Sequence, residues 1–153
     1  RQQRSRVKQA SKQEPLISLA REASRLDEPH LRQQIAQAIA YKKLNALNTA
    51  RAKADLSQGT SSSIMSLGKL AMSRILHEEG RLRTEILGAE SLLEGAEHPR
   101  AEDANFLSLN AYFTSIGGGT DQVQRNIIGE RVLGLPKEPE VDKTIAFRDV
   151  RTS

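Results

Sequence analysis

The sequence predicts an all-α protein, most simply an antiparallel four-helix bundle. Three observations lead to this prediction. Apolar residues recur at three- and four-residue spacing over long stretches, which places them on one face of a helix. No stretch of useful length alternates apolar and polar residues, as a half-buried strand would. Only 3% of the residues are aromatic and Trp is absent. Leu, Ile and Ala must therefore form the core, which suits helix-on-helix packing.

The first two helices have clear start signals. Pro15 suits the first turn of a short helix that runs to about Leu26. The step Asp27-Glu28-Pro29 then starts a long helix to about Ser57, because Asp can cap free N–H groups and Glu complements the positive helix end. Its apolar face comprises Leu31, Ile35, Ile39, Leu44 and Leu47.

A third long helix is expected after the break at Gly59, with Thr60 to Ser63 as possible caps and Gly95 to Pro99 at its end. Within it, Gly68 and Gly80 indicate close packing or a bend. The next segment, residues 101–113, is less clear from its pattern. It predicts a short helix or an irregular packed segment.

The last helix is expected from about Thr120 to Leu133, with Val123, Ile127 and Ile128 facing inward. These elements divide the chain into a basic mobile leader (residues 1–14), a helical bundle (residues 15–135) and a C-terminal tail (residues 136–153).

Composition excludes several classes of function. There is no Cys, which excludes disulfides, thiolate metal sites and a Cys nucleophile, and fits a cytoplasmic location. No apolar run approaches the roughly 18–20 residues of a membrane span. The three histidines, His30, His77 and His98, lack metal-ligand spacing, so we expect surface or capping roles and no metal site.

The net charge of +4 and the basic leader raise the alternative of nucleic-acid binding. The basic side chains there are Arg1, Arg4, Arg6, Lys8 and Lys12. Aromatic stacking platforms and DNA-binding motifs are missing, so a solvated leader is favoured and no nucleic-acid partner is expected.

Three glycines, Gly117-Gly118-Gly119, lead directly into the start of the last predicted helix. Such a loop exposes backbone N–H groups at the positive end of a helix, where an anionic or polar ligand can bind. The glycines alone would equally suit a simple hinge. They match neither a Walker sequence nor the dinucleotide fingerprint.

The longer stretch around this loop is more specific. Ile116 to Pro136 contains Gln124-Arg125-Asn126 and ends in Arg131-Val132-Leu133-Gly134-Leu135-Pro136. It resembles the C-terminal signature of acyl-CoA dehydrogenases, flavoenzymes that desaturate acyl-CoA thioesters. The segment from Leu16 to Arg32 resembles one actinobacterial-type branch of that family.

The resemblance implies a place and a set of roles. It places the chain in the C-terminal four-helix bundle of a three-domain enzyme whose cofactor is FAD and whose substrate is an acyl-CoA. Gly119, Thr120 and Gln122 match positions that contact FAD in the family. Gly118 stands where many members have the catalytic Glu, so this loop supplies no base and no catalytic residue is assigned.

Two further family segments are not matched. The Arg-Gln-Phe-Gly segment, which meets the flavin of a neighbouring subunit, has no clear counterpart. Glu85-Ile86-Leu87-Gly88-Ala89 stands roughly where a Gln-x-x-Gly-Gly segment meets the flavin diphosphate.

Two functions are therefore left open. One is the C-terminal bundle of an FAD-dependent acyl-CoA dehydrogenase, contributing to flavin contact and oligomer assembly. The other is a non-catalytic helical subunit or interaction module of a heteromeric acyl-CoA dehydrogenase-like complex. In both, the partners are homo- or hetero-oligomeric chains of the same kind.

Overall fold

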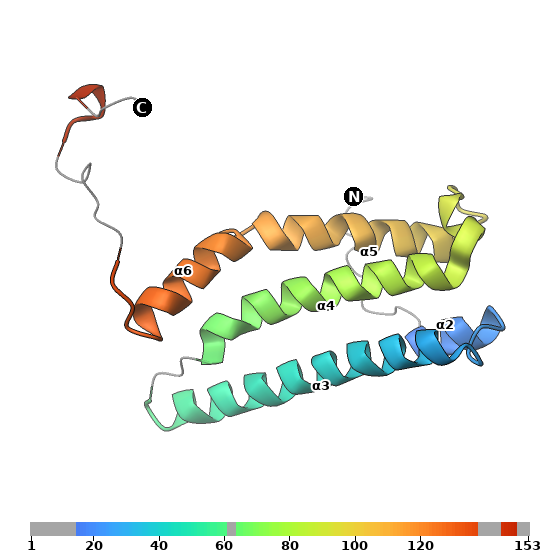
Figure 1. Cartoon of the computed structure of the whole chain (residues 1–153), viewed down its shortest axis with the longest axis horizontal. Coiled ribbons are helices and arrows are strands. Elements are labelled where there is room, and N and C mark those ends of the chain that lie inside the picture. The colour runs from blue at the N-terminus through green and yellow to red at the C-terminus, as the bar shows by residue number, and fades with distance from the viewer. Residues whose placement is uncertain (1–14, 61–63, 138–144, 150–153) are drawn as a thin grey trace.

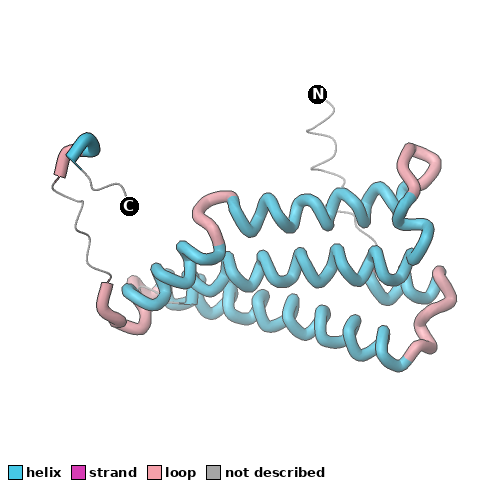
Figure 2. The backbone as a smooth tube through the Cα atoms, turned by 45° about the horizontal axis from the view of Figure 1, so that its top comes forward, coloured by secondary structure: helices cyan, strands magenta, loops and turns pink. Residues whose placement is uncertain are grey.

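The computed structural model describes residues 15–60, 64–137 and 145–149, and within these ranges it contains helices and no strand. Figure 1 and Figure 2 show the arrangement. The α-helices are α2 (Leu16–Glu22), α3 (Pro29–Ser57), α4 (Ile64–Leu87), α5 (Pro99–Ile116) and α6 (Asp121–Arg131), with short 3-10 helices η2 (Gly88–Leu92) and η3 (Phe147–Asp149). The all-α prediction is confirmed.

The helix α4 is the element on which the others pack. It lies between α3 and α5, and the three long helices run antiparallel to their neighbours (Figure 1). The short helix α2 and the last helix α6 also pack against α4. Among the described residues, α3 and α5 have no extensive contact with each other. Because α4 contacts every other α-helix, it carries most of the tertiary structure.

The hydrophobic core lies where α2 and the first half of α3 meet the second half of α4. Leu19, Leu31, Leu82 and Ile86 are almost fully buried there. Away from this core, the leucines in the second half of α3 are half exposed. Leu44 and Leu47 each keep 55% of their surface accessible, although the sequence pattern placed them on the apolar face.

The helices α5 and α6 differ from the sequence expectation. The helix α5 is a regular helix of 18 residues, longer than predicted, with a proline in its first turn. It buries mainly small residues, such as Ala101, Ala104 and Ala111, which let its backbone approach α4. The helix α6 buries no residue, and the prediction that Val123 faces inward is wrong, because that side chain is 47% exposed.

A guanidinium fixes the connection between α2 and α3. Arg25 donates to the backbone carbonyl of Glu85 near the end of α4. It also forms a bidentate pair with Glu28, with Nε–Oε1 2.6 Å and Nη2–Oε2 2.8 Å. Accepting these hydrogen bonds lowers the pKa of the Glu28 carboxyl below its ordinary value.

Replacing Arg25 with Gln is expected to return the pKa of Glu28 toward its ordinary value of 4.5. A carboxyl whose pKa is lowered by folding stabilises the fold above its unfolded-state pKa, and this contribution disappears as the pH falls through the folded-state pKa. The wild-type chain should therefore lose more stability in acid than Arg25→Gln. An NMR titration of the Glu28 carboxyl and urea unfolding at neutral and acidic pH measure both effects. A Glu28 that already titrates normally in the wild type contradicts the prediction.

Several expectations concern residues outside the described ranges. The predicted leader (residues 1–14), the possible caps at 61–63 and residues 138–144 and 150–153 of the predicted tail lie there. Within the described ranges, no helix is long and apolar enough to cross a membrane.

Candidate functional site

The glycine loop between α5 and α6 is short and open to solvent. Gly117 is extended, with φ −65° and ψ 141°, and follows directly on α5. Gly118 and Gly119 have φ of +66° and +92°, which side-chain-bearing residues rarely adopt. Both are exposed. The side-chain amide of Gln124 donates to the carbonyl oxygen of Gly118 at 3.4 Å. The loop therefore bends the chain from α5 into α6 (Figure 1) through backbone angles that glycine readily adopts.

Thr120 caps the helix that follows. Its Oγ1 accepts a hydrogen bond from the backbone N–H of Val123 at 3.2 Å. The N–H groups of Asp121 and Gln122 belong to the first turn and have no partner within the helix. Asp121 complements the positive end of the helix dipole. The expected loop and helix start are thus present, and the first turn of α6 offers N–H donors to a polar or anionic group.

The helix α4 holds the loop through two neighbouring polar residues. Lys69 Nζ donates to the carbonyl oxygen of Gly119 at 2.6 Å and lies 3.5 Å from Asp121 Oδ1. Ser73 Oγ donates to Asp121 Oδ2 at 2.7 Å. Ser73 is almost fully buried, so this contact is shielded from water.

The same serine also reaches the other flank of the loop. Ser73 Oγ lies 2.7 Å from Oγ of Ser115, near the end of α5. His77 Nε2 lies 2.7 Å from the same Ser115 oxygen, and its ring packs edge-on against Tyr112 with centroids 4.9 Å apart. His77 is therefore a hydrogen-bonded, half-buried residue and not the surface or capping residue that the sequence predicted. His30 and His98 are at the starts of α3 and α5.

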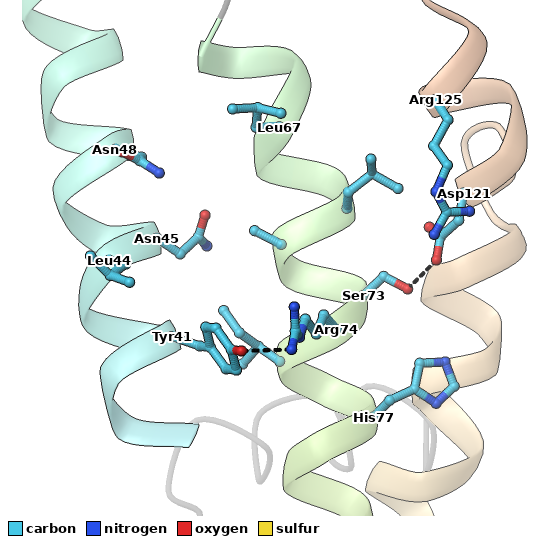
Figure 3. Close-up of a pocket in the computed structure, with 13 residues that line it drawn as sticks. Tyr41, Leu44, Asn45, Asn48, Leu67, Ser73, Arg74, His77, Asp121 and Arg125 are labelled. Atoms are coloured by element: carbon cyan, nitrogen blue, oxygen red, sulfur yellow. Dashed lines mark hydrogen bonds between the residues drawn. The ribbon is translucent and has the colours of Figure 1, made fainter. Parts of the chain in front are cut away.

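A pocket of about 580 Å³ lies between α3, α4 and α6 beside this loop (Figure 3). Its polar lining comprises Tyr41, Asn45, Asn48, Ser73, Arg74, His77, Asp121 and Arg125. Arg74 Nη2 donates to the hydroxyl of Tyr41 at 2.6 Å. The buried oxygens Asn45 Oδ1 and Asp121 Oδ1 accept no hydrogen bond within the described part of the chain. The pocket is thus mixed in character, with an aliphatic wall from Leu44, Leu67 and Leu70.

The predicted site residues lie together at the loop and the start of α6. Gly118, Gly119 and Gln122 are exposed, and Thr120 is half-buried. The acidic residue of this segment, Asp121, is engaged by Ser73 and Lys69. Among the described residues, no group of three or more His, Asp or Glu could hold a metal ion. The arrangement therefore suits binding through backbone and amide groups more than proton transfer.

Sequence reasoning missed Lys69, Ser73 and His77. Their four-residue spacing places them on one face of α4. That spacing is a signal visible in the sequence, but it identifies only a polar stripe. What the stripe contacts depends on where α5 and α6 pack.

Comparison with known proteins defines the class to which this bundle belongs. The family model described as "Acyl-CoA dehydrogenase, C-terminal domain" matches residues 9–133. The chain therefore belongs to the acyl-CoA dehydrogenase family, and the resemblance seen in the sequence is confirmed.

Two curated relatives are similar to most of the chain. The acyl-CoA dehydrogenase IpdE1 of Mycolicibacterium smegmatis is 31% identical over 134 residues, which cover 86% of this chain and 32% of that protein. IpdE1 of Mycobacterium tuberculosis is 30% identical over 128 residues, which cover 80% of this chain and 31% of that protein. The chain thus spans about a third of the length of these relatives. No solved structure matches the chain significantly.

Proposed function

We propose that this bundle is the C-terminal part of an FAD-dependent acyl-CoA dehydrogenase, in which it contacts the flavin and contributes to oligomer assembly. The observation that carries the proposal is the family match together with the open glycine loop at the start of α6. Desaturation of an acyl-CoA thioester and a cytoplasmic location belong to the same proposal. When bound, FAD accepts the hydride in this reaction.

The residues of the loop offer exposed backbone and hydrogen-bond donors that could contact the edge of a flavin. Gly118 and Gly119 leave the backbone exposed, and a Cβ at Gly118 would point into open space. The first-turn N–H groups of α6 are donors for a carbonyl or phosphate oxygen. Gln122 is exposed and makes no side-chain hydrogen bond within the described residues. Its amide is therefore available to a ligand without loss of an internal contact.

Oligomer assembly is supported by apolar side chains that the fold leaves uncovered. Near the end of α5, Leu109, Tyr112, Phe113 and Ile116 are each more than 60% exposed. Burial of such side chains by another protein surface would remove apolar area from water.

Gln122→Ala is expected to weaken FAD binding by the flavoprotein that contains this bundle, with little change in stability. Loss of one amide contact corresponds to a roughly two- to tenfold weaker affinity. Dialysis against decreasing FAD, followed by the visible absorbance of bound oxidised flavin, measures the effect.

The matched control is Gln33→Ala, which removes an exposed glutamine from α3. The control should retain flavin as the wild type does. Equal retention by Gln122→Ala and Gln33→Ala would remove Gln122 from the flavin contact. A purified full-length protein that contains this bundle and binds no flavin at all would contradict the proposed function itself.

The second candidate function is a non-catalytic helical subunit of a heteromeric acyl-CoA dehydrogenase-like complex. The specific observation in its favour is Gly118, which leaves the loop without a carboxylate at the position of the usual base. This function requires stable association with a second acyl-CoA dehydrogenase-like chain that holds the flavin. Purification of a catalytically competent homo-oligomer would eliminate it.

A further inference from the structure

Three polar residues of α4 form a continuous connection to both flanks of the glycine loop. Lys69, Ser73 and His77 are spaced by four residues and therefore lie above one another along the helix. Lys69 and Ser73 bind the last residue of the loop and the first residue of α6, Gly119 and Asp121. Ser73 and His77 bind the segment before it, through Ser115.

Figure 3 shows part of this connection: Ser73 lies between α4 and α6 with its hydroxyl directed at Asp121, and His77 projects from α4 toward α5. The buried hydroxyl of Ser73 is the point at which both flanks meet, because it is 2.7 Å from Ser115 Oγ and 2.7 Å from Asp121 Oδ2. One side chain thus ties the end of α5 to the start of α6.

The number of available protons gives the hydrogen bonds a direction. A carboxylate only accepts, so the single hydroxyl proton of Ser73 goes to Asp121. Ser73 can then only accept in its 2.7 Å contact with Ser115, so the single hydroxyl proton of Ser115 occupies that contact in preference to the backbone carbonyl of Ala111, 3.0 Å away. Ser115 then has no proton left for His77. The contact of 2.7 Å therefore requires the histidine to donate through Nε2–H.

We propose that Lys69, Ser73 and His77 are positioning residues that fix the glycine loop, through hydrogen bonds that begin at His77 Nε2–H and end at the Asp121 carboxylate. Their relation to the flavin rests on the proposed function, whereas the hydrogen-bonded arrangement itself does not. Asp121 is the first residue of α6, so holding its carboxylate also holds the N–H groups that the helix start presents.

The first test uses the full 153-residue chain without flavin. In the wild type, long-range ¹H–¹⁵N spectra of labelled histidine should show His77 with its proton on Nε2. Observation of the Nδ1–H form of His77 would overturn the proposed direction. Because this measurement needs no variant, it remains decisive even if a substitution unfolds the chain.

The second test measures backbone amide exchange at the loop. Ser73→Ala should increase exchange at residues 118–124 by roughly three- to tenfold, because it removes the link to both flanks. Ser115→Ala should act in the same direction. Ser115→Thr, which keeps a hydroxyl, should exchange about as slowly as the wild type. A purely packing role of Ser115 would not give this rescue.

The matched control is Ser91→Ala in η2, which removes a buried serine hydroxyl whose one hydrogen bond among the described residues goes to the nearby carbonyl of Gly88 at 2.7 Å. It should leave exchange at residues 118–124 unchanged. Equal effects of Ser73→Ala and Ser91→Ala on this segment would refute the positioning role. The flavin-retention experiment with Gln122→Ala and Gln33→Ala tests the proposed function separately, since neither the exchange nor the histidine proton is measured with flavin present.

Discussion

Gly80→Ala is expected to lower the free energy of unfolding by about 1–3 kcal/mol, in the range typical of overpacked interiors. A Cβ at this position would lie 2.9 Å from both Cα and Oγ of Ser108 on α5. The hydroxyl could rotate, but the backbone atom can move away only if α4 and α5 separate. The clash therefore outweighs the better helix propensity of Ala. Urea unfolding followed by far-ultraviolet circular dichroism measures the difference.

Gly68 is the matched control on the same helix. A Cβ built there meets no atom within 4 Å, so only the propensity effect remains. Gly68→Ala should raise the free energy of unfolding by about 0.5–1 kcal/mol. The opposite signs of the two substitutions would identify close approach of α4 and α5 at Gly80 as the cause. A stabilising Gly80→Ala would show that the two helices do not pack this tightly in solution.

Glu79→Leu is expected to destabilise the fold by about 3–5 kcal/mol, the range for removing one partner of a buried ion pair. Glu79 Oε2 lies 2.5 Å from Nζ of Lys42 on α3, and its Oε1 lies 3.3 Å from Nη2 of Arg83. Both Glu79 and Arg83 are buried. Without the carboxylate, the buried guanidinium loses the opposite charge of Glu79 in an interior where charges are costly.

A second substitution separates the effect of the remaining buried charge of Arg83 from the effect of the changed side-chain shape at position 79. Glu79→Leu combined with Arg83→Leu should be considerably more stable than Glu79→Leu alone, because no buried guanidinium then remains. Glu78→Leu is the surface control: the side chains of Glu78 and its partner Arg81 are 38% and 45% accessible, so a change of less than about 1 kcal/mol is expected. Chemical unfolding of the four proteins forms the comparison. A Glu79→Leu variant as mild as Glu78→Leu would contradict the role of the buried pair.

Much of the fold could be read from the sequence because its helices carry strong local signals. Pro29 and the spacing of Leu31 and Ile35 identify α3 without tertiary information. The helix α5 was underestimated because its contact with α4 is made by alanines, which give little contrast in an apolar pattern. Val123 was misplaced because an apolar residue on a helix indicates burial only if a neighbouring element covers it.

The candidate site likewise has features that the local sequence predicts and contacts that it does not. The run of glycines and the Thr120 cap are local features, so the sequence predicts them well. The contacts of Ser73 with Ser115 and Asp121 join residues more than 40 positions apart. A polar residue in the middle of a helix does not reveal such partners. The assignments of Gly119, Thr120 and Gln122 to flavin remain predictions, which the Gln122→Ala experiment addresses.

The position of α4 between α3 and α5 has a consequence for the energetics of the whole bundle. Because the two flanking helices do not contact each other extensively, substitutions on one should add independently to substitutions on the other. Coupling between distant sites must instead pass through the shared central helix, whose rotation or translation would shift the glycine loop and the neighbouring pocket together.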